Sequence, residues 1–490
     1  MYSNRPRRAS LNNVFAQAVF FSDFPKSFTD IQIFLKISID FWLALSIIKR
    51  ICFKQNCLKQ IRLILFLKSR ERGFEIMSRE EIKLRNKIGS PADGDDEFFG
   101  REEKLDELIQ KIIDGNSLHI SAPRRIGKTS LMFRAEKELT NRGHICLKCD
   151  LGGLSSPSDW IRKLIKENEN LLRKLAKGLM KNIDDILTKY YIQKDLRPLD
   201  MSVEMVINDS NWKEAGKNLF KELYHSCPNG EKVVIFIDEL AVMIERMQKE
   251  QSKELRHKEA HKDVDFFLAW LGSAHREFHE KISFVAASSI GLLPLLGRLN
   301  LSAHINYLAD FPLEAWDTET AKECILALAR GKEIKISDET AKLMTEMTAT
   351  SGRCSPYYVQ VFFSVANDNL FSKERDSYSK DELLEIYRKY LIRGNAIRPT
   401  LKHMIERLKK SLSVEEYNFA EKILEKLAKN NGVTAVSEVK NIKGKVDKEY
   451  RTYVLDTLEH DGYIEKEGGG YRFRDSPFRD WWSSEYGNGK

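Results

Sequence analysis

The sequence predicts an α/β fold in which a parallel sheet is followed by a helical region and a small C-terminal domain. Three observations support this prediction. A loop at residues 122–130 that contains glycine and lysine stands between an apolar run and a helical pattern. Residues 233–237 are five consecutive apolar residues followed by two acids, as in a strand buried on both faces. Residues 463–474 alternate on both sides of a glycine turn, which is typical of a β-hairpin.

The loop at residues 122–130 predicts a phosphate-binding turn, which we call the phosphate loop. Its residues are Ala122, Pro123, Arg124, Arg125, Ile126, Gly127, Lys128, Thr129 and Ser130. The backbone N–H groups of such a turn and the N-terminus of the following helix face one anion together. Gly127 lets the backbone approach the phosphates, Lys128 is expected to contact the β- and γ-phosphates, and Thr129 to bind Mg²⁺. Ala122 stands where this motif usually has its first glycine.

The acids that follow the apolar run predict metal and water chemistry. Asp238 is expected to hold Mg²⁺, directly or through water, and Glu239 to act as the general base toward the attacking water. Ser289, or its neighbour Ser288, follows the next expected strand and is placed to bond this water or the phosphate. A strand that merely ends in polar residues is the alternative. We therefore predict ATP and Mg²⁺ as cofactors, and catalytic roles for Lys128, Glu239 and Ser289.

The other expected elements are assigned from hydrophobic periodicity and from turn residues. In chain order they are a helix ending near residue 115, a strand at 118–120, helix 130–139, strand 144–150, strand 232–239, helix 260–278, strand 282–287, and helices 318–329, 337–348 and 356–367. Strand, loop, helix and strand in succession indicate a doubly wound sheet. Cys146 and Cys149 are expected to be buried structural residues on opposite faces of their strand.

The C-terminal part predicts a winged helix-turn-helix domain, with helices at 413–430, 435–442 and 445–460 before the hairpin. The third helix and the wing would then contact DNA. The basic residues placed there are Lys440, Lys443, Lys445, Lys448, Arg451, Arg472 and Arg474. However, residues 407–490 hold 16 basic and 15 acidic residues, which is a weak signature for DNA binding. The alternative is a domain that contacts its own α/β core or a protein.

The first 76 residues differ in composition from the rest. They hold 13 basic and 5 acidic residues, whereas residues 77–490 hold 67 of each. One hypothesis is that translation starts at Met77; the other is a membrane-surface anchor. We expect a domain order of extension 1–76, α/β core 77–312 with a helical insertion at about 155–228, helical lid 313–405, and winged helix 406–490. Scattered cysteines and a poor candidate span indicate a cytoplasmic protein without membrane insertion.

Several motifs in order resemble the prokaryotic and archaeal P-loop ATPases of the AAA+/STAND group. They are Phe-Phe-Gly-Arg-Glu at 98–102, the phosphate loop, Phe-Ile-Asp-Glu at 236–239, Ser-Ser-Ile-Gly-Leu at 288–292, Ser-Pro-Tyr-Tyr-Val-Gln at 355–360 and the stretch 471–482. The resemblance implies a P-loop parallel sheet with a helical lid, and it places Gly100 and Arg101 beside the base. Arg276 and Arg298 are arginine-finger candidates, and Arg353 is a candidate for reaching phosphate from the lid.

Three functions fit these features. The first is an ATP-binding switch or ATPase that couples the nucleotide to the C-terminal domain. The second is a DNA-bound ATPase similar to replication initiators or helicase loaders. The third is an interaction module in which ATP is structural. A protein partner or a homo-oligomer is compatible with each of them.

Overall fold

The computed structural model describes residues 82–178, 207–254, 262–430, 432–444 and 447–486. The chain divides into two units, Met1–Ser78 and Arg79–Lys490, and the described residues all belong to the second. The basic extension at 1–76 and the middle of the insertion therefore lie outside the described residues. In the described part, no helix is both long and apolar enough to cross a membrane.

The centre of the second unit is a five-stranded parallel sheet in the order β2-β3-β4-β1-β5. Its strands are β1 (Ser117–Ser121), β2 (Ile145–Asp150), β3 (Val233–Asp238), β4 (Ile282–Ala287) and β5 (Leu308–Pro312). The four predicted strands, which correspond to β1 to β4, are thus confirmed, whereas β5 was not predicted. β3 is buried along its apolar run because β2 and β4 flank it and helices cover both faces. The strands end together at one edge, where Asp150 and Asp238 are direct neighbours in the register.

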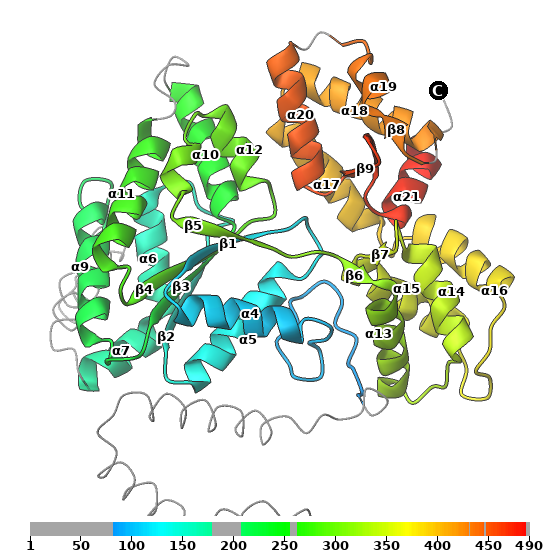
Figure 1. The fold of residues 1–490 in the computed structure, drawn as a ribbon, viewed down its shortest axis with the longest axis horizontal. Coiled ribbons are helices and arrows are strands. Elements are labelled where there is room, and N and C mark those ends of the chain that lie inside the picture. The colour runs from blue at the N-terminus through cyan, green and yellow to red at the C-terminus, as the bar shows by residue number, and fades with distance from the viewer. Residues whose placement is uncertain (1–81, 179–206, 255–261, 431, 445–446, 487–490) are drawn as a thin grey trace, which may run out of the picture. The chain divides into compact units, whose positions relative to one another are not determined.

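Helices cover both faces of the sheet (Figure 1). One face packs on α4 (Glu102–Ile113) and α5 (Lys128–Asn141). The other packs on α6 (Pro157–Glu167), α9 (Trp212–Ser226), α10 (Leu240–Glu254), α11 (Lys262–Phe278) and α12 (Leu292–Arg298). The insertion also contains α7 (Glu169–Gly178). Cys146 and Cys149 are buried on the two opposite faces, as predicted, because strand residues three apart point in opposite directions.

The helical region after the sheet begins with β6 (Trp316–Asp317), which pairs with β7 (Arg353–Cys354). Its helices are α13 (Thr318–Gly331), α14 (Asp338–Thr348), α15 (Pro356–Asn369), α16 (Lys380–Ile386) and the π-helical η3 (Tyr387–Ile392). Side chains of Asp317, Ser337 and Ser379 cap three of these helices at their N-termini. The next helix, α17 (Arg398–Ser411), runs across residue 405, where we expected the lid to end.

The C-terminal segment, residues 413–486, contains the predicted helices and hairpin. Its elements are α18 (Val414–Asn430), β8 (Thr434–Ala435), α19 (Val436–Lys440), α20 (Lys448–His460), β9 (Ile464–Glu467), β10 (Gly470–Phe473) and α21 (Ser476–Tyr486). β8, β10 and β9 form a small antiparallel sheet. Helices α10, α12, α17 and α21 were not predicted from the sequence. In α21, Trp481 and Trp482 are buried against the rest of the segment.

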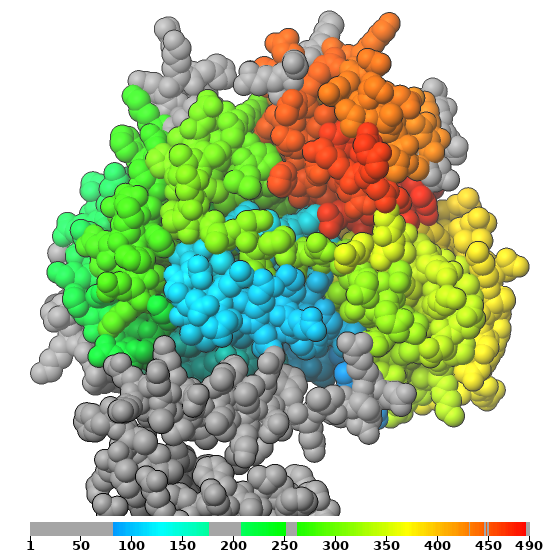
Figure 2. All heavy atoms as spheres, viewed as in Figure 1, coloured from blue at the N-terminus to red at the C-terminus, as the bar shows by residue number. Residues whose placement is uncertain are grey.

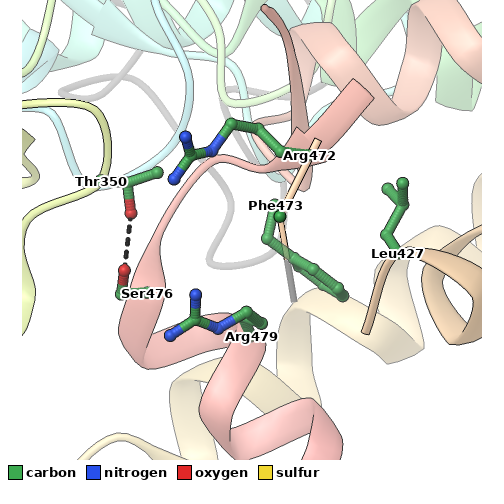
Figure 3. A pocket seen from close by; sticks show the side chains of 7 residues that line it. Thr350, Leu427, Arg472, Phe473, Ser476 and Arg479 are labelled. Atoms are coloured by element: carbon green, nitrogen blue, oxygen red, sulfur yellow. Dashed lines mark hydrogen bonds between the residues drawn. The ribbon is translucent and has the colours of Figure 1, made fainter. Parts of the chain in front are cut away.

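The lid and the C-terminal segment share one hydrophobic core, which runs from α13 to α21. Polar contacts join them too, as Figure 3 shows for the pocket lined by Thr350, Ser476 and Arg472. The hydroxyl oxygens of Thr350 and Ser476 lie 2.9 Å apart, and Arg472 donates to the Ser351 hydroxyl over 2.7 Å. This shared core packs the lid and the segment together.

The C-terminal segment also packs against the α/β part through α20 and α12 (Figure 2). Arg298 of α12 forms an ion pair of 3.2 Å with Glu416, whose side chain is buried. The Arg298 guanidinium also lies 4.4 Å from the centre of the Tyr453 ring on α20. The helix that was expected to enter a DNA groove therefore uses one of its faces to contact the α/β core.

Candidate nucleotide site

The phosphate loop connects β1 to α5 and has an unusual backbone. Arg125 has φ 67° and Gly127 has φ 105°, so the chain twice enters the left-handed region before α5 begins at Lys128. A Cβ on Gly127 would meet no atom within 4 Å, so the inside of the turn has room. Ile126 is buried in the core below the loop, and Ser130 accepts a hydrogen bond from the Ala92 N–H. These contacts fix the loop against the core and against the segment before α4.

Lys128 is buried beneath the loop and donates hydrogen bonds to two of its carbonyl oxygens. Its Nζ lies 2.6 Å from the Ala122 oxygen and 2.8 Å from the Pro123 oxygen. Burial lowers the pKa of Lys128 to about 8, although Glu239 and Asp238 nearby act in the opposite direction. The ammonium is therefore held by neutral acceptors of the loop, and its contact with phosphates stays a prediction.

Thr129 and Asp238 come together as a two-oxygen site. The Thr129 hydroxyl donates to Asp238 Oδ2 over 2.8 Å, and the Glu239 N–H donates to Oδ1 over 2.9 Å. Burial raises the pKa of Asp238, and the neighbouring Glu239 charge raises it further. The described residues contain no group of three or more His, Cys, Asp or Glu that could hold a metal by themselves. This donor set fits Mg²⁺, which keeps waters and phosphate oxygens as its other ligands.

Glu239 directly follows β3 and has φ 59°, a strained conformation for a residue with a side chain. Its Oε2 accepts two hydrogen bonds from Ser289, from the N–H over 2.8 Å and from the hydroxyl over 2.7 Å. Ser288 instead donates nothing to this carboxylate: its Oγ accepts from the Ala241 N–H at the start of α10. Of the two serines, Ser289 is therefore the one that positions the expected base.

Helix α17 lies over the phosphate loop. Arg124 Nη1 is 3.4 Å from His403 Nδ1, and Arg125 Nη2 is 3.4 Å from the Thr400 hydroxyl. The Arg125 guanidinium also stacks 4.7 Å from the centre of the Tyr357 ring of α15. The sequence analysis did not identify Thr400, His403 and Tyr357, because nothing in their local pattern points to the loop.

The turn after α20 contacts both the phosphate loop and the loop after β4. Gly462 has φ 85°, and a Cβ on it would lie 2.5 Å from the Pro123 Cβ. The preceding Asp461 is buried and its Oδ1 accepts a hydrogen bond of 2.9 Å from the Gly291 N–H. We call this pair of contacts, Gly462 on Pro123 and Asp461 on Gly291, the docking contact. Burial raises the pKa of Asp461 to about 7.

Gly100 and Arg101 lie between the phosphate loop and the start of the lid. Arg101 Nη2 donates to the Glu314 carbonyl over 2.5 Å and to the Ile126 carbonyl over 3.4 Å. A Cβ on Gly100 would come within 3.0 Å of the Trp316 indole nitrogen, so only glycine fits there without a shift. The structure thus brings both residues to the junction of loop and lid, and their contact with a base stays a prediction.

The arginines considered for phosphate contact from outside the loop have other partners. Arg298 pairs with Glu416, as described above. Arg353 lies 3.1 Å from Glu314 Oε2 at the start of the lid. Arg276 is on α11, where its Nη1 packs near Gly272. None of the three is placed at the phosphate loop by a hydrogen bond or ion pair among the described residues.

Some of the basic residues expected to contact DNA have partners within the protein, and others are exposed. Arg451 is used inside the segment, where it donates to the carbonyl oxygens of Ile442, Lys440 and Gly444. Arg472 pairs with Glu467 at 2.6 Å. Arg474 is half-buried, whereas Lys440 and Lys443 are exposed. Lys445 and the side chain of Lys448 lie outside the described residues.

No family model and no curated protein matches the sequence. The chain is similar in structure to the Walker-type ATPase of Pyrococcus abyssi, with 14% identity, 80% of this chain and 97% of that chain covered, and a TM-score of 0.53. It is also similar in structure to the ORC2 protein of Aeropyrum pernix in its ADPNP–ADP complexes. The identity is 14%, 83% of this chain and 94% of that chain are covered, and the TM-score is 0.47. The likeness to the Pyrococcus protein, together with the parallel sheet and its phosphate loop, shows that this chain has the α/β fold of a P-loop ATPase with a helical C-terminal region, as the resemblance to the AAA+ group implied.

Proposed function

We propose that this chain is a Mg²⁺-dependent ATPase of the AAA+/STAND type that acts as a nucleotide switch. In this proposal the phosphates of ATP control whether the lid and the C-terminal winged-helix segment stay docked on the α/β core. One observation carries it: the turn at residues 460–462 touches the phosphate loop and the loop that follows β4 at the same time. A ligand that binds between these loops changes the contacts that hold the segment.

Each residue of the site has a chemical task in this proposal. Lys128 turns from the loop carbonyls to phosphate oxygens, while Thr129 and Asp238 hold Mg²⁺, which neutralises phosphate charge when bound. Glu239 accepts a proton from the attacking water at the carboxylate that Ser289 positions. Gly100 and Arg101 form the part of the site, between the phosphate loop and the lid, where the adenine base binds.

Charge explains how the nucleotide acts on the docking contact. Asp461 is a buried acid near the ammonium of Lys128, so a triphosphate at the loop brings further negative charge beside it. The ionised carboxylate and the phosphates repel each other across a poorly solvated space. Docking is then favoured without the γ-phosphate, and release is favoured with it. A difference of a few kcal/mol between the two states suffices for such a switch.

Replacing Gly291 by alanine tests the docking contact directly. The new Cβ would lie 2.7 Å from the His460 Cβ, which forces the turn away, while the backbone at φ −65° accepts alanine without strain. We expect nucleotide exchange to become about 5- to 100-fold faster, as for a coupling of about 1–3 kcal/mol. Release of a fluorescent ADP analogue measures this rate.

Gly297→Ala in the same helix is the matched control, because a Cβ there would meet only the Ser302 hydroxyl at 3.9 Å. Equal exchange rates in Gly291→Ala and in the wild type would show that the turn does not gate the nucleotide.

Asp461→Asn is expected to change how stability depends on pH. The folded pKa of about 7 lies above the ordinary value of 3.8, so the folded state binds more protons between these values. The free energy of unfolding therefore falls as pH rises from about 4 to about 7. Arg407 and Arg124 oppose this shift, whereas Glu245 adds to it. Asparagine keeps an acceptor for the Gly291 N–H, and we expect a gain on the order of 2 kcal/mol at pH 8.

Denaturant unfolding at pH 5 and pH 8 measures this gain, with the exposed Asp447→Asn as control. If Asp461→Asn follows the wild-type pH profile, then Asp461 does not titrate in the docking contact.

DNA binding is the second candidate function, and one observation favours it. Lys422, Lys440 and Lys443 are exposed, and Lys422 Nζ donates to the Lys443 carbonyl, which brings Lys422 close to the chain that carries the other two lysines. Because α20 packs on α12, DNA would have to use these lysines or a released segment. Salt-dependent binding of duplex DNA that falls when the three lysines are neutralised would support this candidate over a switch without DNA.

A further inference from the structure

We propose that residues 82–97 form a strap that fastens the lid to the α/β core and thereby limits how fast nucleotide leaves. The strap belongs neither to the phosphate loop nor to the docking contact, and its effect on nucleotide rests on the proposed function. These residues, all of which the structure describes, precede α4 and contain no helix or strand. Figure 1 shows this segment, in blue, between α5 and α13.

The first part of the strap is bonded to the lid. The Leu84 N–H donates to the Ala327 carbonyl of α13 over 3.0 Å, and Arg330 Nε of the same helix donates to the Ile82 carbonyl over 2.8 Å. The Leu84 side chain is buried in the hydrophobic core of the lid. The backbone bonds and the buried leucine together fix the strap along α13.

Two further contacts show how closely the strap fits the lid. A Cβ on Gly331, the last residue of α13, would lie 1.9 Å from the Leu84 carbonyl oxygen. Any side chain at this position would therefore force the strap away from the helix. Asn86 Nδ2 donates to the Gln360 carbonyl of α15 over 3.1 Å, so the strap contacts two helices of the lid.

The second part of the strap is bonded to α5, the helix that begins in the phosphate loop. The Ala92 N–H donates to the Ser130 hydroxyl over 2.9 Å, next to the expected Mg²⁺ ligand Thr129. Asp95 forms an ion pair with Arg134, one turn further along α5. The strap therefore reaches the helix whose N-terminus faces the phosphates in the proposed function.

A buried carboxylate closes the middle of the strap into a loop. The Glu97 side chain is 2% exposed and accepts hydrogen bonds from the Arg85 guanidinium, from Lys87 Nζ over 3.2 Å, and from the N–H groups of Asp93 and Gly94 over 3.2 Å each. Charge-assisted hydrogen bonds of this kind are stronger than those between neutral groups. The lid end and the core end of the strap are thereby tied to each other.

The path of the nucleotide gives the strap its role. In the proposed function the nucleotide binds between the phosphate loop and the lid, so the lid has to move away from the core before it can leave. The chain itself connects core and lid after β5, and the strap adds a second, non-covalent connection. Such a connection opens by local unfolding, whose cost adds to that of moving the lid. A weakened strap should therefore release nucleotide faster.

Gly331→Ala tests the strap, because the added methyl group would displace the Leu84 carbonyl. The strap has trypsin sites at Lys83, Arg85 and Lys87, so limited proteolysis with mass analysis of the fragments follows its opening. We expect cleavage within the strap and release of a fluorescent ADP analogue each to become about 5-fold faster or more. Without the strap above it, the same change would stabilise α13, since alanine favours a helix over glycine.

Asn86→Ala is the second variant, because it removes the bond to α15 and leaves α13 unchanged. It should act in the same direction, and it carries the comparison if the melting curve shows that Gly331→Ala does not fold. Its matched control is Asn369→Ala, since Asn369 is exposed and donates to a carbonyl within α15 itself. Gly297→Ala, at a helical glycine with space for a Cβ, is the control for Gly331→Ala. Both controls should leave cleavage and release unchanged.

Unchanged cleavage of the strap in both variants would show that it is not fastened to the lid, and would overturn the proposal. Faster cleavage with unchanged release of the ADP analogue would overturn its effect on nucleotide. Failure of the wild-type protein to bind nucleotide would instead overturn the proposed function and the effect on release with it. Proteolysis in the absence of nucleotide would still decide whether the strap fastens the lid.

Discussion

Glu239→Gln is expected to stop ATP hydrolysis while ATP stays bound. The amide keeps the size of the side chain and can still accept from Ser289, but it cannot take a proton from water. Removal of a positioned general base typically costs about 10²–10⁴ in rate. Phosphate release under single-turnover conditions measures the loss, and equilibrium binding of a fluorescent ATP analogue measures the retained affinity.

The matched control is Glu250→Gln, an exposed glutamate on α10, the helix that follows Glu239. It should hydrolyse ATP at the wild-type rate. Hydrolysis by Glu239→Gln at that same rate would mean that another group activates the water. Ser289→Ala should lower the hydrolysis rate less than Glu239→Gln does. It removes a hydrogen bond to the Glu239 carboxylate but leaves the carboxylate in place.

Lys128→Ala is expected to abolish measurable nucleotide binding, with a loss of affinity of about 100-fold or more. The change removes the buried ammonium that would pair with two phosphates, and charged hydrogen bonds of this kind contribute about 1.5–3 kcal/mol each. Isothermal titration with Mg–ATP measures the effect. Lys137→Ala, on the exposed face of the same helix, should bind ATP normally.

The pKa of Lys128 gives this prediction a pH dependence. At a pKa of about 8 the ammonium of the free protein is half deprotonated near that pH and mostly deprotonated above it. Wild-type affinity for ATP should therefore decline as pH rises above about 8, because phosphate binds the protonated form. Normal ATP binding by Lys128→Ala would rule out the phosphate loop as the nucleotide site.

The strands and the phosphate loop were predictable because their signals are local. Apolar runs identified β3 and β4 within a residue of their ends, and the two cysteines of β2 point to opposite faces as the period of a strand requires. The contact of Asp238 with Thr129 could be expected too, since the carboxyl ends of parallel strands meet at one edge. Helix α10 was missed because its apolar start continues directly from the acids of β3.

The sequence by itself determined the α/β core, the phosphate loop and the acids opposite it, because each depends on neighbours along the chain. Only the tertiary structure decided that Gly462 lies on this loop and Asp461 on the loop after β4, that α20 packs on α12, and that α17 turns Thr400 and His403 toward the phosphate loop. Helical spacing shows which residues share a face, but it does not show what that face meets. These contacts join residues about 155 to 340 positions apart, and they follow from the shared core that fixes the C-terminal segment to the lid.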